Sequence, residues 1–220
     1  MDLRKVKAVL FDLDGTLLDT VRDIGACVND VMRRYGCPEH DRVFYTQVIG
    51  HGSRNMIARS LPQSADPALL EQVLRFYVPY YREHCVGKTV PFPGTEDFLD
   101  WLRRKGYLLG LVTNKTQETA EKIMGNYFPN IPFAILWGNN GIRPLKPDPA
   151  SGKLACETLH VLPEEVLFVG DGDTDMEFAS ACGFLACGVT WGYRSTETLL
   201  SCGAQMLVSS FSELQNRMEN

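Results

Sequence analysis

Polar and acidic residues follow three of the short apolar runs in this chain. The first run is followed by Asp12–Thr16 (DLDGT) and the second by Thr113–Lys115 (TNK). The fourth is followed by Gly170–Asp175 (GDGDTD), and Lys146 lies in a Lys-Pro-Asp-Pro loop. Open α/β sheets bind ligands outside the carboxyl ends of their strands. If the runs are strands of such a sheet, these four segments converge on one edge.

The expected cluster contains several carboxylates and a single certain cation, Lys146. Carboxylates held close together do not all stay ionised without a positive partner. With oxygen ligands and no histidine or cysteine nearby, the partner is expected to be a hard divalent ion. Magnesium fits, because it keeps several waters while it bridges to a phosphate oxygen. The sequence therefore predicts Mg²⁺ and a substrate that carries phosphate.

Phosphoryl transfer requires positioning of the phosphate and neutralisation of charge on its equatorial oxygens. Lys146 supplies fixed positive charge, Thr113 a hydroxyl, and Asn114 a backbone N–H. Gly15 lets the chain turn sharply, so that the preceding amides can face the phosphate. The phosphate-binding residues are expected to be Leu13, Thr113, Asn114 and Lys146.

Two carboxylates are the candidates for catalysis. Asp12 is expected to be the nucleophile, because no serine, cysteine or histidine has an equally supported position on this edge. Asp14, two positions further on, can protonate the leaving oxygen and later deprotonate water.

The elements that must position these residues alternate along the chain. Strands are expected over Val6–Phe11, Tyr107–Val112, Phe133–Trp137, Val166–Val169, Phe184–Val189 and Gln205–Val208. Helices are expected over Thr116–Asn126, Pro149–His160 and Thr174–Cys182. This alternation predicts an α/β fold with a doubly wound parallel sheet.

The long interval after the first acidic loop interrupts this alternation. Apolar residues repeat at helical spacing from Val21 to Tyr35, and further helices are expected over Arg54–Leu61 and Pro67–His84. We therefore expect a core of residues 1–19 and 88–220 with an inserted all-helical cap of residues 20–87. Within the cap, Gly50–Arg54 (GHGSR) could face the substrate, with Ser53 capping the next helix, or could form a plain turn.

The motif order resembles the haloacid dehalogenase superfamily of phosphohydrolases. Asp-x-Asp-Gly-Thr, Thr, Lys and Gly-Asp-x-x-x-Asp occur in that order around a helical insertion, and the resemblance covers nearly the whole chain. Within the superfamily the sequence is most similar to the phosphoglycolate phosphatases. That similarity rests on Phe11–Leu17 (FDLDGTL), Gly110–Lys115 (GLVTNK), the Lys-Pro-Asp-Pro loop and Val189–Tyr193 (VTWGY).

The resemblance implies a Rossmann-like core and a magnesium-dependent phosphatase acting on a small phosphomonoester, with 2-phosphoglycolate as the first choice. Asp12 would be nucleophile and metal ligand, and Asp14 would be acid/base with its backbone carbonyl on the metal. Asp171 would be a further ligand, and Asp175 a more distant or water-mediated partner. Asp173 departs from the family pattern and could alter metal affinity, so we assign it no role.

Other functions on the same scaffold stay open. An inorganic pyrophosphatase would use the same core motifs, because these motifs recognise only the phosphate group. A phosphomutase of the β-phosphoglucomutase type would return the phosphoryl group to a sugar, but such mutases tend to have Glu-Asp where this chain has Gly170-Asp171. A dehalogenase is disfavoured because it would need neither Asp14 nor a metal. A silent binding module would not need five intact motif residues.

Composition limits the partners. The chain has a formal net charge of -5 and no basic run, which disfavours nucleic acid. No apolar stretch approaches the ~18 residues of a membrane helix, and no secretion signal is visible. The seven cysteines are scattered and odd in number, which favours a reducing cytoplasm over a disulfide framework. We expect a monomer or homodimer acting on a small phosphate ester.

Overall fold

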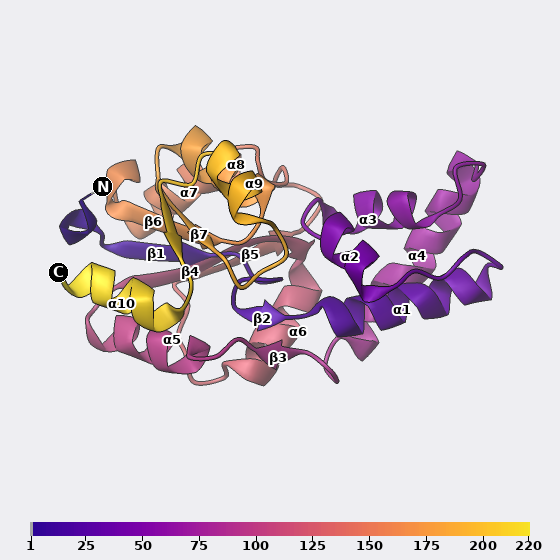
Figure 1. Ribbon diagram of the computed structural model, residues 1–220, viewed down its shortest axis with the longest axis horizontal. Helices are drawn as coiled ribbons and strands as arrows, with labels where there is room; N and C mark the ends of the chain where they lie inside the picture. Colours follow the sequence, from indigo (N-terminus) through magenta and orange to yellow (C-terminus); the bar gives the residue numbers. More distant parts are fainter. Residues whose placement is uncertain (1) are drawn as a thin grey trace.

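The core is a single parallel sheet. The computed structural model describes residues 2–220, and this sheet has six strands in the order β5-β4-β1-β6-β7-β8, every neighbouring pair parallel (Figure 1). Their bounds are β1 Ala8–Phe11, β4 Leu108–Thr116, β5 Ile135–Asn139, β6 Val166–Gly170, β7 Leu185–Val189 and β8 Met206–Val208. All six expected strands are confirmed, and β4 is longer than expected because it continues through the Thr-Asn-Lys motif.

The strand order reverses direction at β1. The chain moves outward from β1 to β4 and β5, then returns to the other side of β1 for β6, β7 and β8. The crevice outside the carboxyl end of β1 is therefore the topological switch point, where doubly wound sheets bind ligands.

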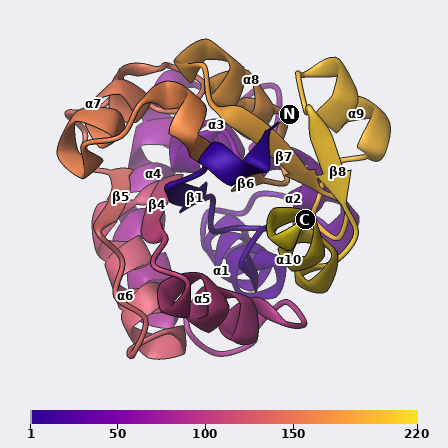
Figure 2. The same ribbon diagram turned by 90° about the vertical axis from the view of Figure 1, so that its left-hand side faces the viewer.

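Helices cover both faces of the sheet (Figure 2). On one face lie α5 (Thr95–Arg104), α6 (Gln117–Tyr127) and α10 (Phe211–Glu219); on the other lie α7 (Ala150–Leu159), α8 (Asp173–Cys182) and α9 (Thr196–Ser201). Side chains of a strand alternate between faces. Accordingly, Phe11 packs edge-on against Phe98 in one apolar cluster, while Leu10 lies in the other cluster together with Phe178. Two short 3-10 turns, Leu3–Lys5 and Pro163–Glu165, complete the core.

The insertion lies on the right of Figure 1 and consists of four helices. They are α1 (Val21–Arg34), α2 (Arg42–Val48), α3 (Gly52–Ser60) and α4 (Pro67–His84). The Asp41 side chain accepts from the Phe44 N–H at the start of α2, and Asp66 caps α4 at the Leu69 N–H. An all-helical cap is confirmed, and α2 is a helix that the sequence pattern did not predict.

A small antiparallel sheet joins the cap to the core. It pairs β2 (Leu18–Asp19) with β3 (Val90–Pro91). Just inside the cap, the buried Asp23 carboxylate of α1 accepts from the N–H groups of Lys88 and Thr89. Because these contacts join the two ends of the insertion, we propose that the cap comprises residues 20–87. Among residues 2–220, no helix has the length and apolar character needed to cross a membrane.

Candidate active site

The turn after β1 places the first motif at the switch point. The Asp12 N–H donates to the Val169 carbonyl of β6, and the Leu13 carbonyl accepts from the Leu17 N–H, 3.1 Å away. Gly15 has a φ of +86°, a conformation that other residues rarely adopt. A Cβ at Gly15 would lie 2.2 Å from a carboxylate oxygen of Asp171, so only glycine lets the turn approach that side chain.

Three buried carboxylates meet beside this turn. Oxygens of Asp12, Asp171 and Asp175 lie within 4.8 Å of one another. The Lys146 ammonium donates to Asp12 Oδ1 at 2.9 Å and to Asp175 Oδ1 at 2.7 Å, with the lysine 4% exposed. The expected convergence of the strand ends is therefore observed for these four side chains.

Burial and mutual repulsion shift the pKa values of the residues in this group. Burial, with the charges of Asp175 and Asp12, raises the pKa of Asp171 well above its usual range. Burial also raises the pKa of Asp175 to about 6, against the lowering effect of Lys146. For Lys146 itself, burial acts to lower the pKa, but Asp12 and Asp175 outweigh it and the pKa is raised. The lysine stays charged, and one cation faces three carboxylates.

The donor set fits a hard divalent cation. Asp171 is held in place because its oxygens accept from the Thr16 hydroxyl at 3.1 Å and the Tyr193 N–H at 2.7 Å. Oxygen-only donors with excess negative charge suit Mg²⁺. Asp175 belongs to this group directly, whereas the Asp14 side chain is not one of the three. The Asp14 backbone carbonyl stays a predicted ligand.

Asp14 is held by a second buried cation. Lys115 Nζ donates to both carboxylate oxygens of Asp14, at 2.7 and 2.8 Å, and the Thr20 hydroxyl donates to Oδ1 at 2.6 Å. Lys115 is buried, and its ammonium lies 4.8 Å from the centre of the Tyr81 ring of α4. Counting Lys146 as the single certain cation was therefore wrong. The signal was present in the third residue of the Thr-Asn-Lys motif.

The neighbouring motif residues organise the loops around the site. The Asn114 side chain accepts from the Lys146 N–H at 2.7 Å and donates to the Gly50 carbonyl at 2.8 Å, so it links the lysine loop to the cap. Thr113 is buried and lines the cleft. Phosphate binding by Thr113, by the Asn114 N–H and by the Leu13 N–H stays a prediction.

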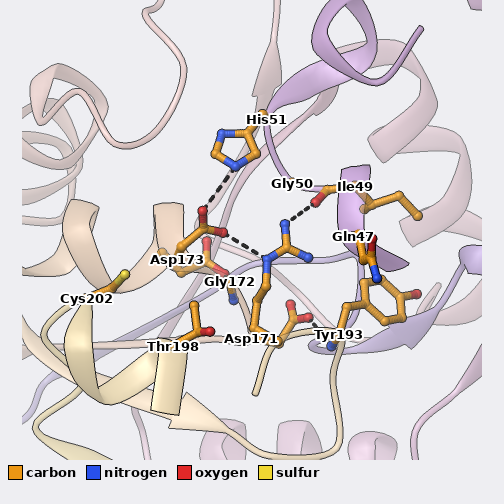
Figure 3. A network of polar contacts seen from close by, with 12 residues as sticks. Gln47, Ile49, Gly50, His51, Asp171, Gly172, Asp173, Tyr193, Thr198 and Cys202 are labelled. Carbon is orange, nitrogen blue, oxygen red and sulfur yellow. Dashed lines mark hydrogen bonds and ion pairs between the residues drawn. The ribbon is translucent and has the colours of Figure 1, made fainter. Parts of the chain in front are cut away.

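Asp173 turns toward the cap instead of the carboxylate group. Its Oδ2 lies 3.1 Å from His51 Nε2 (Figure 3). Its Oδ1 accepts from Arg194 Nε at 3.1 Å. Arg194 also donates to the carbonyls of Thr46 at 2.6 Å and Ile49 at 2.7 Å. The His51 hydrogen bond and the Arg194 charge lower the pKa of Asp173. We call Asp173, Arg194 and His51 the bridge, because they connect the core to the loop before α3.

A cleft lies between the core and the cap. On the core side it is lined by Asp12, Asp14 and Thr113–Thr116; on the cap side it is lined by Ile24, Ile49, Gly50, Gly52, Ser53, Met56, Tyr77 and Tyr81. The loop of Gly50 and Ser53 therefore faces the cleft, as the first of the two interpretations expected. Ser53 is not a cap, however, because it lies inside α3 and His51 occupies the N-cap position.

Comparison with known proteins places the chain in a family. The sequence profile of the haloacid dehalogenase-like hydrolases matches residues 9–189. The chain is 33% identical to a phosphoglycolate phosphatase from Chromobacterium violaceum, with all of both chains covered. It is 34% identical to an N-acetylmuramic acid 6-phosphate phosphatase from Pseudomonas aeruginosa, over 90% of this chain and 87% of that protein.

Solved structures agree with this assignment. The crystal structure of CbbY from Rhodobacter sphaeroides in complex with phosphate has a TM-score of 0.81 and 26% identity, covering 95% of this chain and 96% of that one. The crystal structure of a protein from Lactobacillus delbrueckii subsp. bulgaricus has a TM-score of 0.90 and 27% identity, covering 96% of this chain and 98% of that one. The family and the similarity to phosphoglycolate phosphatases, both expected from the motifs, are confirmed: this chain belongs to the haloacid dehalogenase-like hydrolases.

Proposed function

We propose that the protein is a magnesium-dependent phosphatase that hydrolyses a small phosphomonoester, with 2-phosphoglycolate as the substrate, through a phosphoryl group carried on Asp12. The observation that carries the proposal is the buried group of Asp12, Asp171, Asp175 and Lys146 beside the cleft. The names of the relatives supply the substrate.

The first half of the reaction transfers the phosphoryl group to the enzyme. An Asp12 oxygen attacks phosphorus, a new O–P bond forms, and the bond from phosphorus to the alcohol oxygen breaks. Protonated Asp14 gives its proton to the departing oxygen, so that an alcohol leaves instead of an alkoxide. Mg²⁺ held by Asp12 and Asp171 would supply charge neutralisation at the phosphate. Lys146 fixes the orientation of Asp12.

The second half returns the enzyme to its starting state. Asp14, now a carboxylate, takes a proton from water, and the water oxygen attacks phosphorus. The bond between Asp12 and phosphorus breaks, inorganic phosphate leaves, and Asp14 is again protonated. In the structure Lys115 and Thr20 hold the Asp14 carboxylate at the cleft in the ionised form that accepts the proton from water. The cap excludes bulk water from the charged intermediate.

Phosphate release measured across a panel of phosphomonoesters and pyrophosphate tests the proposal. We expect activity with Mg²⁺, loss of activity in excess chelator, and recovery when Mg²⁺ is restored, with Ca²⁺ a poor substitute because its looser coordination misplaces the attack. Mass spectrometry of enzyme quenched during turnover should show a phosphorylated peptide containing Asp12. Full activity in chelator, or phosphorylation elsewhere, would contradict the mechanism.

The free cysteines bear on the cellular location of the protein. All seven cysteines are free in the structure, which supports a reducing cytoplasm. We propose that the protein acts there as a monomer or homodimer on a small molecule.

A further inference from the structure

The cap side of the cleft presents the start of a helix. Gly52 and Ser53, the first residues of α3, line the cleft together with Gly50. The first N–H groups of a helix have no partner within the helix, and the side chain of the N-cap residue, His51, does not cap α3. These N–H groups and the partial positive charge of the helix N-terminus favour a negatively charged group.

The core fixes this helix start in position. Gly50 and Gly52 have φ values of +118° and +81°, and a Cβ at Gly52 would lie 3.0 Å from a Leu145 methyl carbon. The carbonyls of Ile49 and Gly50 accept hydrogen bonds from Arg194 and Asn114. Because the carbonyls are bound by the core, the loop is held against the cleft instead of moving freely beside it.

Tyr81 lines the same cleft, and its hydroxyl is unpaired. The Tyr81 hydroxyl of α4 is, within residues 2–220, the only buried side-chain nitrogen or oxygen without a hydrogen-bond partner, and Tyr81 is 5% exposed. Burial raises the pKa of this hydroxyl well above its usual range, so it stays protonated and can donate. Leaving such a group unpaired is costly, and a bound ligand would remove that cost.

No cation competes for this role on the cap side. In the described chain, none of the cap residues that line the cleft carries a charge. Lys115 on the core side is already bound to Asp14. Arg54 follows Ser53 but forms an ion pair with Glu71, and its side chain is 61% exposed. An anion on the cap side would therefore be held by N–H and O–H donors and not by an ion pair.

We propose that the start of α3, with the hydroxyls of Ser53 and Tyr81, is the site that recognises the carboxylate of a short phosphorylated acid. This inference rests on the proposed function and extends it, because it names the group of the substrate that the cap binds. The phosphate would bind beside Asp12 and the carboxylate at Ser53 and Tyr81, on opposite sides of one cleft.

Three substrates that differ in one group test this proposal. The carboxylate of 2-phosphoglycolate becomes a hydroxymethyl group in 2-hydroxyethyl phosphate and a methyl group in ethyl phosphate. We expect the wild type to prefer 2-phosphoglycolate over 2-hydroxyethyl phosphate by about tenfold or more in kcat/KM. Tyr81→Phe, which keeps the ring over Lys115, should lower kcat/KM for 2-phosphoglycolate by about tenfold, the effect of one hydrogen bond to a charged group. Ethyl phosphate should be unaffected.

Two further variants complete the experiment. Tyr80→Phe is the matched control, because its hydroxyl lies on the same helix but donates to Asp30 at an exposed site; we expect no change. Ser53→Ala should weaken the preference in the same direction as Tyr81→Phe.

Several results would overturn the proposal. Equal losses on all three substrates in Tyr81→Phe would assign the hydroxyl a purely structural role. A second contrary result is that Arg54→Gln loses the preference for 2-phosphoglycolate while Tyr81→Phe keeps it. That result would show that an ion pair with Arg54 binds the carboxylate. A wild type without the preference would refute the site while leaving the phosphatase proposal intact. Absence of hydrolysis of all three substrates and of p-nitrophenyl phosphate would instead refute the proposed function, and this inference with it.

Discussion

The core side of the cleft carries the ion-paired side chains of Asp12, Asp14 and Lys115, whereas none of the described residues that line its cap side is charged. Asp12 is bound by Lys146 and Asp14 by Lys115, so each core carboxylate at the cleft already has a cation. Opposite them lie apolar side chains, glycines and the hydroxyls of Ser53, Tyr77 and Tyr81. The two sides are built from different chemical groups.

This difference separates two tasks. Phosphoryl transfer needs positive charge and a fixed nucleophile whatever alcohol carries the phosphate. Recognition of the alcohol needs shape and hydrogen bonds that differ from one substrate to another. Substitutions on the core side should therefore affect every substrate, and substitutions on the cap side should affect only some.

Asp12→Asn should have the largest effect. The substitution keeps the size of the side chain but removes the nucleophile, so we expect turnover of every phosphomonoester to fall by about a thousandfold or more. Without metal, the free energy of unfolding should stay unchanged or rise, because one of three mutually repelling carboxylates is neutralised. Phosphate-release assays and urea denaturation measure the two quantities.

Asp97→Asn, an exposed aspartate of α5, serves as the control for that experiment. A variant of Asp12 that kept a tenth of the wild-type activity would contradict covalent catalysis by this residue.

Asp14→Asn should have a smaller effect that depends on the leaving group. General acid catalysis contributes about a hundred- to ten-thousandfold, and a departing alkoxide needs it far more than nitrophenolate does. The first step should therefore slow severely for alkyl phosphates and mildly for p-nitrophenyl phosphate. The phosphorylated enzyme should accumulate, because the base that activates water is missing.

Rapid-quench kinetics on both substrates, with mass analysis of the protein, provides the measurement. Equal losses on the two substrates without phosphorylated enzyme would remove Asp14 from the acid/base role. Such equal losses would still fit the separation between the two sides of the cleft, because a core residue would then affect every substrate alike.

Arg194→Met tests the connection between the two sides. The variant loses three hydrogen bonds, to Asp173 and to the carbonyls of Thr46 and Ile49. We expect faster amide hydrogen exchange over residues 46–53 and a fall of about tenfold in kcat/KM, because the start of α3 is no longer held against the cleft. Arg194→Lys should be intermediate, since lysine lacks the planar fork. Unchanged exchange in this loop would show that the bridge does not position it.

His51→Ala should have the smallest effect. Its contact with Asp173 is made by a side chain that is 37% exposed, and polar contacts at such sites contribute little. We expect kcat/KM to change by about twofold at most. A loss as large as that of Arg194→Met would mean that the histidine, and not the arginine, carries the bridge.

Much of this arrangement could be predicted from local patterns. Apolar runs ended by polar motifs gave the six strands and the edge where Asp12, Lys146 and Asp171 meet, because a strand end fixes which residues reach the ligand side. The helix α2 was missed because seven residues contain too few periods of an amphipathic pattern, although Asp41 was a usable capping signal.

The features that could not be predicted depend on contacts between segments that are distant in the sequence. Lys115 belongs to a motif visible in the sequence, but its ion pair with Asp14 and its contact with the Tyr81 ring appear only in the folded chain. Asp173 likewise contacts His51, which lies 122 positions away. The unpaired Tyr81 hydroxyl has no sequence signal at all, because an absent partner is visible only once the whole fold is assembled.

The pairing of β2 with β3 has a consequence for how such proteins diversify. The chain leaves the core at Asp19 and returns at Val90, directly across a two-stranded sheet. Neighbouring strands lie about 5 Å apart, so the core presents two adjacent attachment points. A gene segment of any length whose product has neighbouring ends could be spliced there without disturbing the sheet. Selection can then exchange the recognition module while the machinery for phosphoryl transfer is inherited unchanged.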